Sequence, residues 1–466
     1  MMSKHTLTET GRTPFFSHDP QFYKSWVRLF LLLALQNIVT YSVNVADNIM
    51  LGMYSQTALS GAAAVNQIQY VLQQVIGSGL GDGLAVLGAQ LWGRHDTDSL
   101  EKLSGQALFC GWVIGLVLTA VAFIAPEGMV RLFTSDAAIV AEGTAYLRVM
   151  RWSYLVFITT TLILCTLRSV QIAGIAFRLS VMALVVNVGI NRVLIFGALG
   201  FPELGIRGAA VGTLIARVLE LIVLLLWCMR KGHVPFSLRP KRIFRHDGAL
   251  LRRYASVALP CVISALLFSG SVAMQTVVMG HLNADAIAAN SAAATLFQYC
   301  KMIPIGASAA SGAVIGRIIG TGDTRQLRSD VHTLQAIFIG LGLLMGGLLS
   351  LISGPIISLY TLTDQARTYA EQMIMVLSVV AVCTGYQMPC LVGVIRGGGD
   401  TRFVLRVDII FGCVIVVPLS CCAAFLWHWS VPMVTLCLYI DQLVKVFVVT
   451  IRLHGTAWVK RLTESV

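Results

Sequence analysis

The chain has 466 residues, of which 56% are hydrophobic and only 12% are charged. A soluble protein of ordinary composition carries about 25% charged residues, so most of this surface is not expected to face water. The formal charge of +12 would suit a nucleic-acid-binding protein only if the basic residues were gathered on one soluble face.

Apolar stretches long enough to cross a bilayer, which takes roughly 20 residues, recur along nearly the whole chain. They are continuous rather than alternating, which favours helices over a β-barrel. We therefore expect an all-α polytopic membrane protein with twelve transmembrane helices. The expected spans are 27–52, 58–91, 103–125, 143–167, 179–199, 208–229, 255–280, 286–316, 331–354, 372–395, 407–426 and 432–451.

The basic residues fix an expected orientation. The polar start of the chain shows no pattern for a cleavable signal peptide, so the first apolar run is read as the first span. With both termini in the cytoplasm, the segments on that side hold 25 of the 34 Lys and Arg residues, and the opposite loops hold 3. The positive-inside rule favours this orientation. It predicts a multi-pass protein of the bacterial inner (plasma) membrane, and it explains the basic charge without nucleic acid.

The longest polar interruption divides the spans into two groups of six. The expected organisation is a cytoplasmic tail (1–26), an N-lobe (27–229), a cytoplasmic inter-lobe loop (230–254), a C-lobe (255–451) and a cytoplasmic C-terminal tail (452–466). This predicts two pseudo-symmetric six-helix bundles.

An internal repeat supports this division. The stretch DNIMLGMYSQTALSGAAAVNQIQY, which begins at Asp47, resembles QTVVMGHLNADAIAANSAAATLFQ, which begins at Gln275, and Arg168 falls on Arg396. The offset is about 228 residues. Because each half has six spans, the repeats are parallel, an arrangement known from transporters. A duplicated membrane protein without transport activity is the alternative.

Enzymatic signatures are missing from the sequence. It contains no GxxxxGK[ST] and no HExxH, and its 11 cysteines are scattered. We expect no enzyme, no cofactor and no resident metal beyond a coupling Na⁺. The run GSGLGDG at 77–83 lies within an apolar span, where small residues let helices approach closely, so it is interpreted as packing.

A polar stripe follows the first span. Asn37, Thr40, Asn44 and Asp47 are spaced three, four and three residues apart, which places them on one helix face. An ionised side chain in mid-membrane costs roughly 2.5–3.5 kcal/mol, so Asp47 is a candidate ion or proton site. The alternative is an interfacial Asp at the end of the helix.

Neutral oxygen-bearing side chains recur on other spans. They are Gln67, Tyr70, Asn187, Asn191 and Thr213. Oxygen donors of this hard type suit Na⁺ or a proton relay. Each of them can also be an ordinary interhelical hydrogen bond.

Other buried charges are expected within the spans. Asp441 and Lys445 on one span, and Arg217 and Glu220 on another, are spaced for neutralising pairs. Lys301 has no acid nearby in sequence. It either pairs across the bundle or faces a water-filled cavity between the lobes.

Several motifs resemble one family of transporters. They are DNIMLG (47–52), QLWGRHD (90–96), NVGINRVLIFG (187–197), GIRGAAVGTLIAR (205–217) and VIRGGGDTRF (394–403). Together with the two groups of six spans, they make residues 25–455 resemble a MATE (multidrug and toxic compound extrusion) transporter. The resemblance implies a V-shaped pair of lobes around a central cavity, which exports organic solutes in exchange for Na⁺ or H⁺.

The resemblance also implies a site. The family's N-lobe cation site falls here on Asp47, Asn187, Asn191 and Thr213, with Asn191 in place of a second carboxylate. The acids that NorM-type members carry in the C-lobe fall on Phe268-Ser269 and Gly385. The chain therefore resembles a DinF-like or unassigned bacterial subgroup. A single buried carboxylate suits proton exchange because burial disfavours its charged form, and Na⁺ remains open.

The expected partners are a small organic solute, amphipathic and drug-like, and membrane lipid. No nucleic acid is expected, and the protein is expected to be a monomer. The candidate residues for the solute cavity are Tyr41, Asn44, Gln67, Tyr70, Gln275, Phe297, Lys301, Tyr386 and Met388.

Three rival functions stay open at this point. A lipid-linked oligosaccharide flippase shares a two-lobe helical architecture and would favour several cationic cavity residues, for which Lys301 and Arg192 are the candidates. A membrane-embedded enzyme would need clustered His or carboxylate ligands. A channel or receptor is disfavoured by the repeat.

Overall fold

The computed structural model describes residues 15–230, 232–234, 247–282, 284–322, 324–357 and 362–463. Most of the expected inter-lobe loop, 230–254, and the outermost parts of both tails lie outside the described residues.

The first half of the chain forms one bundle of helices. They are α1 (Pro20–Tyr54), α2 (Gln56–Gln73), the π-helix η1 (Gln74–Gly81), α3 (Asp82–Gly93), α4 (Thr97–Ile124), α5 (Pro126–Arg131), α6 (Ala137–Met150), α7 (Ser153–Ser169), α8 (Gly174–Phe196), the short 3₁₀ helix η2 (Ala198–Gly200) and α9 (Gly205–Met229).

The second half forms a second bundle. It consists of α11 (Gly248–Gly280), α12 (Ala284–Thr321), α13 (Leu327–Ile357), α14 (Asp364–Met388), the π-helix η3 (Pro389–Ile395), α15 (Thr401–Asp408), η4 (Ile409–Val416), α16 (Val417–Cys421), η5 (Cys422–Leu426), α17 (Val431–Leu438) and α18 (Ile440–His454), with η4 and η5 also π-helical.

Each of the twelve expected spans coincides with helix. Among the described residues, ten helical stretches are long and apolar enough to cross a membrane, and α6 with α7, bent by 55°, makes an eleventh. The expected span 58–91 is divided among α2, η1 and α3, because the helix passes through a π-helical segment. Several helices extend beyond the predicted bounds. α1 begins at Pro20 rather than at residue 27, because Asp19 caps it by accepting a hydrogen bond from the backbone N–H of Gln21.

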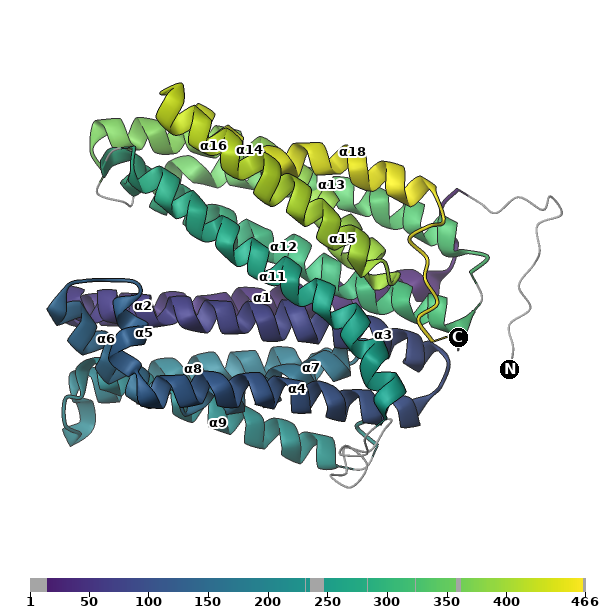
Figure 1. The fold of residues 1–466 in the computed structure, drawn as a ribbon, viewed down its shortest axis with the longest axis horizontal. Coiled ribbons are helices and arrows are strands. Elements are labelled where there is room, and N and C mark those ends of the chain that lie inside the picture. The colour runs from purple at the N-terminus through teal and green to yellow at the C-terminus, as the bar shows by residue number, and fades with distance from the viewer. Residues whose placement is uncertain are drawn as a thin grey trace.

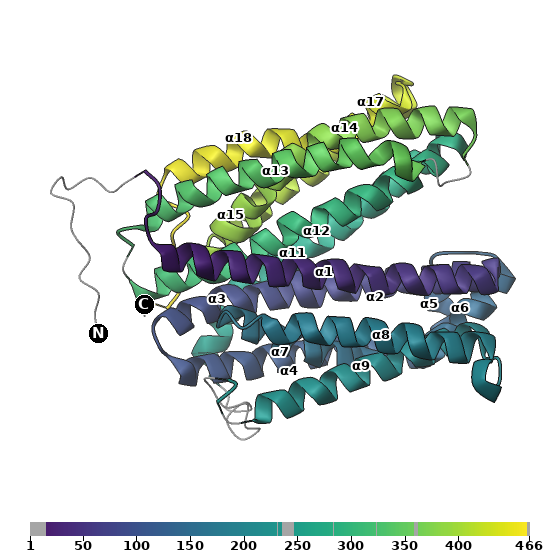
Figure 2. The same cartoon turned by 180° about the vertical axis from the view of Figure 1, so that it is seen from behind.

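The two bundles form two lobes. α2 to α9 lie on one side and α12 to α18 on the other, and the lobes approach each other at the end of the molecule where α1 begins and α18 ends (Figures 1 and 2). We call this the terminal end. Glycines permit the close approach, because a Cβ at Gly93 would meet the Arg317 carbonyl at 2.2 Å and one at Gly320 would meet the Gln90 carbonyl at 2.2 Å.

The first long helix of each half crosses to the opposite lobe at the terminal end. Trp26 of α1 is buried among residues of the C-lobe and donates its indole N–H to Ser311 Oγ at 2.8 Å. Tyr254 of α11 is buried among residues of the N-lobe and donates its hydroxyl to the Leu80 carbonyl at 3.0 Å. These two aromatic residues are 228 positions apart. The internal repeat therefore places a matching cross-lobe hydrogen bond at each of the two crossings, that of α1 and that of α11.

The C-terminal segment, residues 455–463, joins the lobes at the same end. Trp458 is buried, and the Lys460 backbone N–H donates to the Gly398 carbonyl at 2.8 Å. The buried Gln90 amide of α3 donates to the Lys460 carbonyl at 2.9 Å and accepts from the Leu462 N–H at 2.8 Å. We call residues 455–463 the C-terminal strap, because it binds both lobes.

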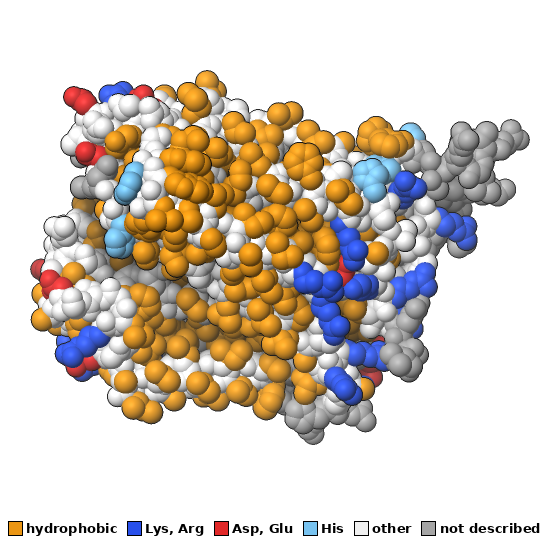
Figure 3. Space-filling view, turned by 45° about the horizontal axis from the view of Figure 1, so that its top comes forward, with side chains coloured by type: hydrophobic (Ala, Val, Ile, Leu, Met, Phe, Trp, Pro, Cys, Tyr) orange, Lys and Arg blue, Asp and Glu red, His pale blue; other side chains and the backbone are white. Residues whose placement is uncertain are grey.

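The side chains on the surface are mostly hydrophobic, as the composition of the chain predicts. Hydrophobic side chains cover the middle of the visible face, and Lys and Arg side chains gather toward the terminal end (Figure 3). Exposed large apolar residues such as Leu351, Val414 and Ile451 would each be costly in water and are favourable in lipid.

Candidate ion-coupling site

The centre of the candidate site is the carboxylate of Asp47. It lies on α1, seven residues before the helix ends at Tyr54, and is 8% exposed. Asn191 of α8 donates its amide N–H to Asp47 Oδ1 at 2.5 Å. The carboxyl group is thus held by a directed hydrogen bond inside the lobe and does not project into lipid.

Two further neutral side chains extend from this pair. The same Asn191 amide donates to Asn187 Oδ1 at 3.2 Å, and Asn187 donates to Thr213 Oγ1 of α9 at 3.2 Å. Asn187 and Asn191 are one turn apart, so α8 presents both on one face. All four predicted residues are buried and belong to one connected network from three helices.

One oxygen of this network has no hydrogen-bond donor among the described residues. It is Oδ1 of Asn191, which is fully buried. A buried acceptor without a partner costs about 1–3 kcal/mol, so its retention needs a reason. It faces α9 at Gly212, where a Cβ would come within 2.1 Å of it. Glycine at this position therefore makes room for the Asn191 side chain.

The other residues of the polar stripe have different environments. Asn44 is exposed, and Thr40 donates to Ser180 Oγ of α8 at 3.3 Å. Tyr41, beside the stripe on α1, lies edge-on to Tyr299 of α12, with ring centroids 4.8 Å apart. This part of α1 thus contacts both α8 of the N-lobe and α12 of the C-lobe.

The remaining cavity candidates are spread over both lobes. Gln67 is exposed, and Tyr70 accepts a hydrogen bond from Gln74 at 3.1 Å. Gln275 donates to the Leu438 carbonyl at 3.5 Å, and Phe297 is 2% exposed. Tyr386 lies in the C-lobe core, where its hydroxyl bonds Gln335 and Thr450, both at 2.9 Å, and Met388 is half-buried.

The expected charge pairs have unequal outcomes. Lys445 pairs with Asp441 at 3.0 Å, as expected, and also with Asp408 at 3.3 Å. Arg217 and Glu220 lie in each other's field, but among the described residues they form no ion pair within 4.0 Å. The Arg217 guanidinium instead faces the Gln69 amide of α2 at 3.1 and 3.2 Å, donates to Ser153 Oγ at 3.4 Å and lies over the Phe157 ring. Helical spacing brought the two charges near each other, but packing turned Arg217 toward α2 and α7.

Sequence reasoning missed Asp82. It begins α3 and pairs with Arg168 at 2.7 Å and with Arg396 at 2.9 Å. The available signal is the repeat, which matches Arg168 with Arg396. Asp82 was overlooked because it lies in the glycine-rich run 77–83, which is interpreted from the sequence as helix packing. That packing is present around it, since Gly79 and Gly83 contact Val262 and Ala258 of α11.

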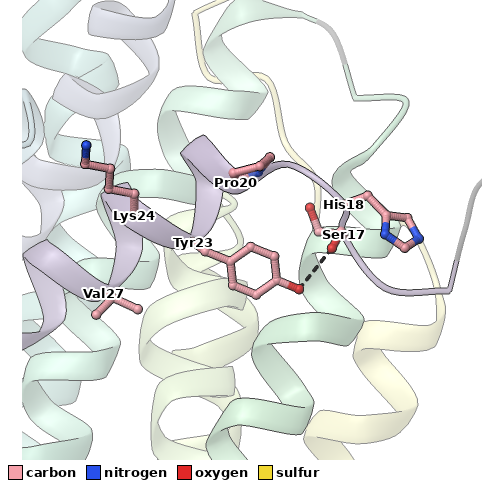
Figure 4. A pocket seen from close by; sticks show the side chains of 6 residues that line it. All are labelled: Ser17, His18, Pro20, Tyr23, Lys24 and Val27. Carbon is pink, nitrogen blue, oxygen red and sulfur yellow. Dashed lines mark hydrogen bonds between the residues drawn. The ribbon is translucent and has the colours of Figure 1, made fainter. Parts of the chain in front are cut away.

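A pocket at the start of α1 lies outside the site. A shallow pocket of about 720 Å³ at the start of α1 is lined by Ser17, His18, Pro20, Tyr23, Lys24 and Val27 (Figure 4). Lys24 is about six helical turns from Asp47, so this pocket is separate from the polar network.

Among the described residues, no group of three or more His, Cys, Asp or Glu side chains could hold a metal ion.

Comparison with known proteins agrees with this architecture. The family model for MatE matches residues 33–193 and 260–422, one block in each lobe. The chain belongs to the MATE family, whose members are membrane transporters and not enzymes.

Individual relatives are distant but nearly full-length. The chain is 27% identical over 416 residues to a "Probable multidrug resistance protein NorM" of Xylella fastidiosa (strain 9a5c), covering 88% of this chain and 87% of the relative. It is 25% identical over 407 residues to the "Multidrug resistance protein MdtK" of Pectobacterium atrosepticum, covering 85% and 88%.

Solved structures share the fold. A MOP superfamily transporter from Pyrococcus furiosus superposes with a TM-score of 0.85 at 18% identity, covering 97% of this chain and all of the other. A crystal structure of MATE in complex with MaL6 superposes with a TM-score of 0.83 at 20% identity, covering 93% and 96%. The fold class expected from the sequence, a two-lobe helical membrane protein, is therefore confirmed.

Proposed function

We propose that this protein is a secondary-active antiporter, which exports amphipathic organic solutes in exchange for inward H⁺ or Na⁺. One observation carries the proposal: the Asp47 carboxyl group is buried in the N-lobe and is hydrogen-bonded to Asn191, which continues through Asn187 to Thr213. The repeat places Gln275 at the matching position of the C-lobe, so the acid is peculiar to one lobe. The names of the bacterial relatives support the export of drug-like solutes.

Exchange at Asp47 follows from the two states of its carboxyl group. In the arrangement described here, the Asn191 N–H satisfies one carboxylate oxygen. A proton arriving at Asp47 removes the charge and weakens that bond, because hydrogen bonds to charged groups are stronger than those to neutral ones. Release of Asn191 then changes the packing of α1 against α8. Proton binding is thereby linked to helix position.

Sodium would use the same residues differently. The Asn191 amide would turn so that Oδ1, now without a donor, faces the ion beside the Asp47 carboxylate. Asn187 and Thr213 would add neutral oxygens. With Asn191 in place of a second acid, the site offers one negative charge, and this favours H⁺ as the coupling ion.

Alternating access would require the cross-lobe contacts at the terminal end to break and re-form. We assign this end to the cytoplasm, because the basic loops and both tails belong to it. The cross-lobe bonds of Trp26 and Tyr254 would then close the cytoplasmic side while solute leaves on the other. The solute would bind between the surfaces of α1, α2, α11 and α12. These surfaces carry Tyr41, Asn44, Gln67, Tyr70, Gln275, Phe297 and Lys301. Tyr386 and Met388 would act from deeper in the C-lobe.

The test is the variant Asp47→Asn. It removes the charge but keeps the shape and a hydrogen-bonding group, so folding should be preserved. In proteoliposomes with an imposed H⁺ or Na⁺ gradient, uphill solute transport should be lost, while binding of solute to the purified protein persists. Continued accumulation of solute against its gradient by the variant would show that coupling lies elsewhere.

A further inference from the structure

Lys301 has an unusual environment near the middle of α12. Its ammonium nitrogen lies 5.2 Å from the ring centroid of Phe297 and 5.9 Å from that of Phe268 on α11. Among the described residues, it makes no hydrogen bond and no ion pair within 4.0 Å. A cation is therefore held in the membrane region by two ring faces alone, although burying an unpaired charge is costly.

The nearby acids are already engaged. Asp441 is bound by Lys445 at 3.0 Å and by the Gln442 amide at 2.7 Å, and Asp408 is bound by Lys445 at 3.3 Å. Lys445 thus takes the direct contacts of both carboxylates. The field of Asp441 reaches Lys301, but no carboxylate oxygen of the described residues lies within 4.0 Å of the Lys301 ammonium group.

The surroundings of Lys301 are aromatic and only partly filled. The Tyr439 ring, at the break between α17 and α18, lies edge-on to Phe297 with centroids 5.5 Å apart. Phe268 shares a face of α11 with Gln275, which reaches the Leu438 carbonyl, so this face is turned toward the same break. Phe268 is nevertheless 47% exposed. Its ring surface therefore remains available beside a half-buried Lys301.

We propose that Lys301, with the rings of Phe268, Phe297 and Tyr439, forms a binding site for an aromatic solute that carries a carboxylate. The solute's carboxylate supplies the counter-ion that the ammonium lacks, in a charge-assisted hydrogen bond. Its aromatic body covers the open face of Phe268 in offset or edge-on contact. This inference rests on the proposed transport function and names the class of one of its solutes.

The two proposed sites, one in each lobe, thereby carry opposite charges. The N-lobe network centres on the anionic Asp47, and the aromatic group of the C-lobe centres on the cationic Lys301. A solute carboxylate is attracted to the second site and repelled from the first. Coupling ion and anionic solute can then occupy the protein without competing for one side chain.

The experiment uses the full chain in nanodiscs, with no ion gradient, and three probes of one shape: 2-naphthoate, 2-naphthamide and 2-naphthylmethylammonium. The intact protein should bind the carboxylate about tenfold more tightly than the uncharged amide, as expected for one charge-assisted hydrogen bond. Lys301→Met keeps the apolar stem and should abolish this preference. Lys301→Arg should retain it. Lys24→Met, at an exposed position on α1, should leave it unchanged.

Two results would overturn the proposal. One is an intact protein that binds naphthoate no better than naphthamide, which needs no variant and is independent of any folding defect. The other is a folded Lys301→Met that keeps the wild-type preference. Because no gradient is applied, a failure of ion coupling cannot imitate either result. Asp47→Asn should still prefer naphthoate, so the two proposals can fail separately.

Discussion

Gly212 offers a direct test of the coupling site, because the substitution acts on Asn191 and leaves Asp47 itself unchanged. An alanine Cβ at this position would lie 2.1 Å from Asn191 Oδ1, whereas real Cβ contacts essentially never fall below 3.0 Å. The two atoms must therefore separate by about 0.9 Å. A shift of that size would weaken or break the 2.5 Å bond from Asn191 to Asp47.

The expected cost has two parts. Overpacking a well-filled helix contact costs about 1–3 kcal/mol. Loss of a hydrogen bond to a charged group costs about 1.5–3 kcal/mol more. The overpacking part lowers the stability of the fold. Since a tenfold change corresponds to about 1.4 kcal/mol, the lost hydrogen bond by itself should lower the gradient-driven transport rate of Gly212→Ala by about tenfold or more. The loss should be visible in proteoliposomes when transport is divided by the amount of folded protein.

Gly189→Ala is the matched control. Gly189 lies on α8 between the two asparagines, and a Cβ there meets nothing within 4 Å. Replacing glycine with alanine inside a helix stabilises it by about 0.8–1 kcal/mol, so this variant should melt at the same or a higher temperature. It should also transport normally. Wild-type coupling in Gly212→Ala, or an equal loss in both variants, would refute the assignment of Asn191 to the coupling site.

Two further predictions concern the terminal end. Gln90→Leu removes both hydrogen bonds to the C-terminal strap, each worth about 0.5–1.5 kcal/mol, and should shift spin-label distances between positions 102 and 325 toward longer values. Gln365→Leu should leave these distances unchanged, because the Gln365 amide bonds Tyr369 on its own helix. An unchanged distance distribution would show that the strap does not hold the lobes together. In intact cells of a cysteine-free variant, an impermeant thiol reagent should label Thr134→Cys and not Thr456→Cys; labelling of Thr456→Cys would reverse the proposed orientation.

The sequence by itself determined the class of protein, an all-helical membrane protein with two lobes. Long uninterrupted apolar runs have one stable form in a bilayer, because every backbone polar group must be satisfied within the segment. Spacing showed that Asn187 and Asn191 share a helix face, and the resemblance linked them to Asp47 and Thr213. The structure brings these four residues into one hydrogen-bonded network, whose role in ion coupling stays a prediction.

The tertiary structure decided which partner each buried polar group takes. Helical spacing paired Arg217 with Glu220, but a long side chain follows the contacts around it, and here the guanidinium contacts Gln69 on α2 and Ser153 on α7. The repeat matched Arg168 with Arg396 but could not show that both converge on Asp82, since that requires the two lobes to meet. The crossing of α1 and α11 into opposite lobes likewise depends on contacts between residues 285 and 174 positions apart. Local periodicity carries no information about such contacts, because it reports which face of a helix is buried and not what lies against it.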